Sequence, residues 1–162
     1  MYKRQIVFRL LQAAPSHAVY FGAKDWQQVL VVRKMVHDLK LDVEVMTCPT
    51  VRDTDGLAMS SRNTYLSESE RNRAQTIYAA LEQAAQNWCR GLAIDTIEQK
   101  VRDMLSAKEI QIDYADIVHT ESLKKISEVS QNTPAIFLIA CRVGSTRLID
   151  NILLPSQALS SC

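Results

Sequence analysis

The stretch HAVYFGAKDWQQ, residues 17–28, decides the fold of the first part of the chain. Its first five residues are apolar and partly β-branched, and they stop at Gly22, which is typical of a buried strand. Asp25 and Gln28 stand three positions apart, as in a capping box, so a helix is predicted to begin at Asp25. The hydrophobic spacing that follows extends this helix to about Leu39.

Residues 42–47 alternate in hydrophobicity and predict a second strand. Strand, helix and strand within about thirty residues form a βαβ unit, whose two strands should be parallel. A helix is predicted over residues 5–13, before Pro15. A nucleotide-binding open sheet needs more than one βαβ unit, so either this sheet is very small or the chain is part of a longer one.

Pro49 marks the boundary between two predicted domains, residues 1–48 and 49–162. The second is predicted to be α+β, because its apolar spacing changes from helical to alternating. Its predicted elements are an ordered polar loop over 50–64, a long helix opened by a Ser67–Glu70 capping box and stopped at Gly91, a helix over 95–106, and strands over 112–118, 134–142 and 146–153, the last two joined at Gly144-Ser145.

The composition argues against several classes of protein. Nineteen Lys and Arg face eighteen Asp and Glu, and this balance argues against a broad nucleic-acid or membrane-surface footprint. No apolar run is long enough to span a bilayer, and no signal peptide is recognisable, so we expect a cytoplasmic protein. The four cysteines form no C-x-x-C pair, which predicts free thiols and no metal site.

The turn from Gly22 to Gln28 is a candidate phosphate site. It lies where a parallel strand ends and a helix begins, and the N-terminus of a helix offers unpaired N–H groups and a partial positive charge. Gly22 lets a ligand approach the backbone, and Lys24 adds a cation. The alternative is an ordinary capped helix with a solvated lysine.

The loop from Asp55 to Asn63 is a second candidate. Ser60, Ser61 and Arg62 can hold a polyphosphate through two hydroxyls and a guanidinium. The alternative is a polar connecting loop. Two phosphate-suited loops around one βαβ unit favour a nucleotide site, provided that the Lys24 turn and the Ser61 turn converge on one triphosphate pocket.

Three stretches carry a resemblance to a known family. Residues 20–28, YFGAKDWQQ, resemble the signature FGEKDFQQ of the pantothenate synthetase (pantoate–β-alanine ligase) family. Residues 49–63, PTVRDTDGLAMSSRN, are similar to a loop of that family, and residues 142–151 resemble its C-terminal hairpin. The resemblance implies an α/β fold in which a remnant of a Rossmann-like nucleotidyltransferase sheet is followed by a small α+β domain.

The resemblance also implies an activity. The family joins pantoate to β-alanine with ATP and Mg²⁺ through a pantoyl adenylate, releases AMP and pyrophosphate, and acts as a homodimer in pantothenate and coenzyme A biosynthesis. The matched positions imply pantoate binding by Gln28. They imply ATP binding by Gly22, Ala23, Lys24, Asp25, Val51, Met59, Ser60, Ser61 and Arg62, of which Lys24, Ser60, Ser61 and Arg62 are the predicted catalytic residues.

The chain departs from the family pattern in several places. The family's His-x-Gly-His-type motif is absent, and the three histidines His17, His37 and His119 lie in no such pattern. The other pantoate residues and the acidic metal-side residues would lie upstream. Ala23 stands where the family has Glu. Residues 1–5 do not resemble the family, so we expect a truncated start, non-native first residues and an inactive isolated chain.

Two other interpretations stay open. The part from Pro49 onward could be a non-catalytic dimerisation or interaction module. Alternatively, the chain could belong to another adenylate-forming nucleotidyltransferase that uses a different acid, although Gln28 and the close match of both loops count against it. A His-x-Gly-His motif encoded upstream of Met1 would favour the ligase over the module.

Overall fold

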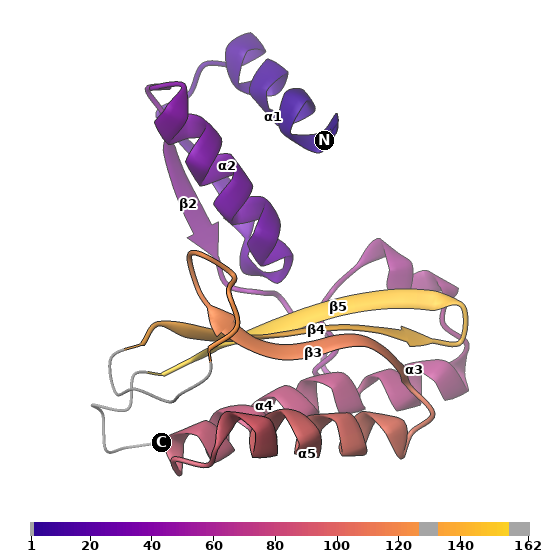
Figure 1. The fold of residues 1–162 in the computed structure, drawn as a ribbon. Helices are drawn as coiled ribbons and strands as arrows, with labels where there is room; N and C mark the ends of the chain where they lie inside the picture. Colours follow the sequence, from indigo (N-terminus) through magenta and orange to yellow (C-terminus); the bar gives the residue numbers. More distant parts are fainter. Residues whose placement is uncertain (1, 127–132, 156–162) are drawn as a thin grey trace. The chain divides into compact units, whose positions relative to one another are not determined.

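The computed structural model describes residues 2–126 and 133–155 of the chain. Within it, the chain divides into two compact units, residues 1–50 and residues 51–162. The first unit holds a parallel two-stranded sheet, and the second holds an antiparallel three-stranded sheet (Figure 1). The predicted fold class, a parallel α/β part followed by an α+β part, is confirmed.

The first unit is built around the predicted βαβ motif. Its elements are α1 (Tyr2–Ala13), β1 (Ala18–Gly22), the short 3-10 helix η1 (Ala23–Asp25), α2 (Trp26–Asp38) and β2 (Glu44–Cys48). β1 and β2 pair in parallel, with Ala18 opposite Glu44 and Gly22 opposite Cys48. The α2 side chains Trp26, Val29, Val32 and Met35 are buried.

The predicted capping box at Asp25 is wrong. Among the described residues, no hydrogen bond from the Asp25 side chain caps α2. Asp25 has φ −92° and ψ 58°, not the extended backbone that directs an N-cap side chain back to the helix, because the η1 turn leads the chain into α2. At the other end, α2 ends at Asp38, one residue before the predicted end at Leu39, which is exposed.

The second unit packs three helices and a 3-10 turn with its sheet. Its elements are η2 (Ser61–Tyr65), α3 (Glu68–Ala74), α4 (Thr76–Cys89), α5 (Ile94–Ser106), β3 (Gln111–His119), β4 (Ala135–Val143) and β5 (Thr146–Leu154). The strands follow the order β3-β4-β5, and both neighbouring pairs are antiparallel. The helices α4 and α5 cover one face of this sheet (Figure 1), and Trp88 and Phe137 are fully buried between the layers.

Local signals in this unit predict its elements well. The Ser67–Glu70 capping box is present, with both reciprocal hydrogen bonds. The hairpin between β4 and β5 turns at Gly144, whose φ of +58° is one that favours glycine. The long predicted helix is instead two helices, α3 and α4, which meet at Gln75.

The cysteines are partly as predicted. Cys48 and Cys141 are free thiols, but Cys89 takes part in a disulfide, so the prediction of free thiols is wrong for Cys89. Burial, together with nearby Asp113, raises the pKa of the Cys141 thiol to about 12, which makes it unreactive. Of the helices described, none has both the length and the apolar character needed to cross a membrane.

We expect Gly56→Ala to destabilise the second unit more than Gly91→Ala does. Both glycines have positive φ, +83° and +74°, so alanine at either costs about 1 kcal/mol in backbone strain. A Cβ at position 56 would also lie 2.9 Å from Cδ1 of Tyr78, whereas at position 91 no described atom lies within 4 Å. Urea unfolding measures both variants, and equal losses would contradict this account.

Candidate functional site

The first predicted loop lies at the carboxyl end of β1. Gly22 is exposed, and no described atom lies within 4 Å of the Cβ that a larger residue would place there. The η1 turn and the first turn of α2 follow directly, so the N-terminus of α2 and Gly22 are close along the chain. Lys24 and Gln28 are half-buried, and Asp25 is exposed. This arrangement brings Gly22, Lys24 and the N-terminus of α2 together at the carboxyl end of β1, a setting that suits an anionic ligand.

The second predicted loop begins as a short hairpin. Arg52 and Ala58 form an isolated antiparallel bridge. Beside it, the Asp53 N–H donates to the Leu57 carbonyl at 2.9 Å, and the Met59 N–H donates to the Val51 carbonyl at 2.9 Å. The segment 51–59 is therefore ordered by its own backbone, as the sequence predicted for this loop. Val51 and Met59 at its open end are both exposed.

A compact turn follows the hairpin and presents the predicted phosphate-binding side chains. The Ser60 hydroxyl accepts from the Arg62 N–H at 3.2 Å, and the Thr64 hydroxyl donates to the Ser61 carbonyl at 2.8 Å. The Arg62 guanidinium donates to the Arg147 carbonyl on β5 at 3.2 Å. Ser61 and Arg62 remain exposed, so both can still reach a ligand.

An open hollow of about 570 Å³ lies beside this turn. Its lining residues are Asp53, Met59, Ser60, Ser61, Asn63, Thr64 and Arg71. Three of the predicted ATP residues are among them, and the hydroxyls and guanidinium there suit a phosphate chain. The Asn63 amide donates to the Ala58 carbonyl at 3.2 Å, while its buried Oδ1 has no hydrogen-bond partner among the described residues.

Arg71, on α3, is a residue of this hollow that the sequence analysis missed. Its guanidinium donates to Asp53 Oδ2 and to Asp55 Oδ2, each at 2.8 Å. Burial acts to raise the pKa of Asp55, but the Leu57 N–H and the Arg71 guanidinium outweigh it, so the net pKa lies below its usual range. The sequence offered one local signal for Arg71: it lies four residues after the predicted helix cap Ser67, near the polar loop.

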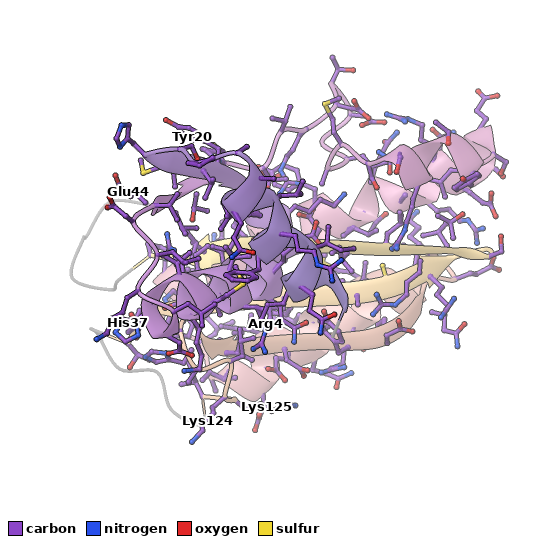
Figure 2. The ribbon with its side chains drawn as sticks, turned by 90° about the horizontal axis from the view of Figure 1, so that it is seen from above. Arg4, Tyr20, His37, Glu44, Lys124 and Lys125 are labelled. Carbon is purple, nitrogen blue, oxygen red and sulfur yellow. The ribbon has the colours of Figure 1, made fainter. Side chains whose placement is uncertain are left out.

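Two histidines and the metal-ligating side chains of the described residues were further candidates for a site. Figure 2 shows the His37 side chain extending from α2 toward solvent. The His119 ring at the end of β3 accepts from the Glu121 N–H at 3.2 Å. Within residues 2–126 and 133–155, no three His, Cys, Asp or Glu side chains form a group that could hold a metal ion.

Comparison with known proteins decides the family. The model of the family described as "Pantoate-beta-alanine ligase" matches residues 4–153. The chain belongs to this family. The family model therefore extends over both phosphate-suited loops and the C-terminal hairpin, as the three sequence resemblances predicted.

Individual members of the ligase family agree. The pantothenate synthetase of Rubrobacter xylanophilus is 46% identical over 153 residues, which are 93% of this chain and 52% of that protein. The pantothenate synthetase of Rhodopirellula baltica is 47% identical over 90% of this chain and 51% of its own length. The crystal structure of pantothenate synthetase from Thermus thermophilus superposes with a TM-score of 0.89 at 40% identity, over 94% of this chain and 55% of that one.

This chain thus spans about half the length of the curated ligases that it matches. The two loops that the sequence analysis singled out lie in different units, Lys24 in residues 1–50 and Ser61 in residues 51–162. Their convergence on one triphosphate pocket, and the role of each residue in it, stay predictions.

The lowered pKa of Asp55 predicts how stability depends on pH. A carboxylate whose pKa is lower in the folded state stabilises the fold above its unfolded-state pKa of about 3.9, and this contribution is lost as the pH falls through the folded-state value. The free energy of unfolding of wild type should exceed that of Asp55→Asn most at about pH 6, and the difference should narrow toward about pH 2. A pH-independent difference in urea unfolding would contradict this.

Proposed function

We propose that the protein containing this chain condenses (R)-pantoate with β-alanine at the expense of ATP. An oxygen of the pantoate carboxylate attacks the α-phosphorus, the bond to the bridging oxygen breaks, and pyrophosphate leaves. The β-alanine nitrogen then attacks the acyl carbon of pantoyl adenylate, loses a proton, and displaces AMP. The observation that carries the proposal is the Ser60–Arg62 turn beside the hollow, with Ser61 and Arg62 exposed, in a chain that belongs to the ligase family.

The chemistry of adenylyl transfer suits the donors on these loops. Negative charge builds up on the α-phosphate and on the departing pyrophosphate, so fixed hydrogen-bond donors and cations lower the barrier. We assign this role to Lys24, Ser60, Ser61 and Arg62. The carboxylate nucleophile is already ionised and needs positioning more than activation, which we assign to the half-buried Gln28 amide.

A solved relative supports two of the ligands. The pantoate–β-alanine ligase of Francisella tularensis, crystallised with "Beta-gamma ATP and Beta-alanine", superposes with a TM-score of 0.69 at 25% identity, over 93% of this chain and 48% of that one. We extend ATP and β-alanine binding to this protein from that likeness. The backbone donors around Gly22, Ala23 and Asp25 and the exposed Val51 and Met59 are the further positions that we assign to ATP.

Mg²⁺ is proposed as a companion of ATP. Because Mg²⁺ at nucleotide sites keeps several waters and takes only one or two carboxylates besides the phosphates, it does not require a full protein cage. The described residues hold no group of three or more metal-ligating side chains, so the steps above are written without the ion. We also propose a cytoplasmic location, where ATP is available, and a homodimer, which the resemblance to the family implies.

Calorimetric titration of the 162-residue chain with ATP in the presence of Mg²⁺ tests the proposed site. A hydrogen bond to a charged group contributes about 1.5–3 kcal/mol, so Lys24→Ala and Ser61→Ala should each weaken ATP binding by about tenfold or more. Lys34→Ala is the matched control, because Lys34 is an exposed α2 lysine that pairs with Asp38 at 3.1 Å. Its affinity should equal that of wild type.

Two results would contradict the proposal. One is that the full-length protein that contains this chain fails to bind ATP at millimolar concentration, and the other is that Lys34→Ala weakens binding as much as Lys24→Ala. In an assay of AMP release by the full-length protein that contains this chain, dependence on both pantoate and β-alanine supports the proposed reaction. Release of AMP that requires a different carboxylic acid in place of pantoate would show that another acid is the substrate.

A further inference from the structure

Arg52 makes an unusually complete set of contacts for a loop residue. Its Nη1 lies 2.6 Å from Asp150 Oδ2 and its Nη2 lies 3.1 Å from Asp150 Oδ1, which is a bidentate ion pair. Nη1 also donates to the Gly56 carbonyl at 3.1 Å. The guanidinium carbon lies 3.7 Å from the centre of the Tyr78 ring on α4, within cation–π distance.

The partner carboxylate is fixed as firmly as the guanidinium. Only 3% of the Asp150 side chain and 18% of the Arg52 side chain is exposed. The Asp150 Oδ1 also accepts from the Asn151 N–H at 2.8 Å. A buried pair whose lone pairs and N–H groups are satisfied in this way has one favoured geometry, because any displacement leaves a buried charge without its partner.

This pair is connected directly to the Ser60–Arg62 turn. The bridge between Arg52 and Ala58 and the hydrogen bond from the Met59 N–H to the Val51 carbonyl make the two arms of the 51–59 hairpin one unit. Anchoring Arg52 therefore also fixes Met59, the residue immediately before the turn. At the end of the turn, the Arg62 guanidinium donates to the Arg147 carbonyl. The turn is thus held on both sides by β5, through Asp150 and Arg147.

We propose that Arg52 and Asp150 are positioning residues that fix the Ser60–Arg62 turn on β5 in the geometry that binds a triphosphate. Neither residue lines the hollow, so neither is expected to touch the ligand. The inference rests on the proposed function, because it assigns to this pair the placement of hydroxyls that the reaction needs fixed. Preorganised donors act on developing charge only if they stand in place before the reaction, and misplacement by about 1 Å can cost about 100-fold.

The test separates positioning from simple stabilisation. Asp150→Asn keeps the shape of the side chain but leaves the buried guanidinium without its counter-charge. The double variant Arg52→Met/Asp150→Leu replaces both charges by apolar groups of similar size, a replacement that buried ion pairs often tolerate in stability. Glu109→Gln is the matched control, because it removes an ion pair of the same unit, 3.2 Å from Arg73, that does not contact the hairpin.

Two measurements are made on the full 162-residue chain. Amide hydrogen exchange of residues 59–62 without ligand should be about tenfold faster in Asp150→Asn and in the double variant than in wild type, while β3 and β4 amides exchange as in wild type. The ATP dissociation constant from calorimetry should rise about tenfold or more in both variants. Glu109→Gln should change neither quantity.

Each result has a definite meaning. Unchanged exchange at residues 59–62 in a folded double variant would overturn the positioning role, as would unchanged ATP affinity with faster exchange. Faster exchange throughout the β3–β5 sheet would show that the pair only stabilises the unit, which also overturns the inference. If the 162-residue wild type binds no ATP, this chain alone does not form the proposed ATP site, whereas exchange at residues 59–62 still decides whether the pair holds the turn.

Discussion

The ion pair between Arg52 and Asp150 joins two parts of the chain that lie 98 positions apart in sequence. Because both groups are largely removed from water, their mutual orientation is fixed by the cost of separating them. The pair adds a long-range anchor to the hairpin over residues 51–59, which is also ordered by its own backbone hydrogen bonds and by the buried Leu57. It ties this hairpin to β5, on which the following turn also rests through Arg62.

The packed core of the second unit holds the elements that contact Arg52. The helices α4 and α5 bury Trp88 and Phe137 against one face of the β3-β4-β5 sheet, so β5 is a rigid support. Tyr78 of α4 meets the loop from the helical side, where its ring lies against the Arg52 guanidinium. Gly56 leaves the room that the Tyr78 ring occupies. The position of the loop therefore depends on the packing of α4 against the sheet.

In the first unit, the path of the backbone positions the predicted phosphate-binding turn. The parallel pairing of β1 and β2 brings Gly22 to the carboxyl end of the sheet, and the η1 turn leads directly into α2. The N–H groups at the start of a helix need partners, and an anion can provide them. The proposed binding of an anion in this unit therefore rests on chain direction and a helix terminus. In the second unit the proposed binding rests on side chains held by hydrogen bonds and ion pairs.

The sequence by itself determined the elements whose signals are local. Alternating and helical hydrophobic periods, the Ser67–Glu70 capping box and the turn at Gly144 specify neighbouring residues, so the βαβ motif, the helices and the β4–β5 hairpin could be predicted. Both phosphate-suited loops could be found in the same way, from glycine, hydroxyl and cationic residues close together. Family membership followed from the same short stretches.

Tertiary structure decided what depends on distant partners. Arg52 and Asp150 read as ordinary surface charges until the fold brings them together, and Arg71 gains its role only because α3 places it beside Asp53 and Asp55. The prediction of a cap at Asp25 was wrong although Asp25 and Gln28 have the spacing of a capping box. The η1 turn gives Asp25 a backbone conformation that this spacing does not specify. Sequence spacing encodes short-range geometry, whereas a buried ion pair depends on how the whole chain packs.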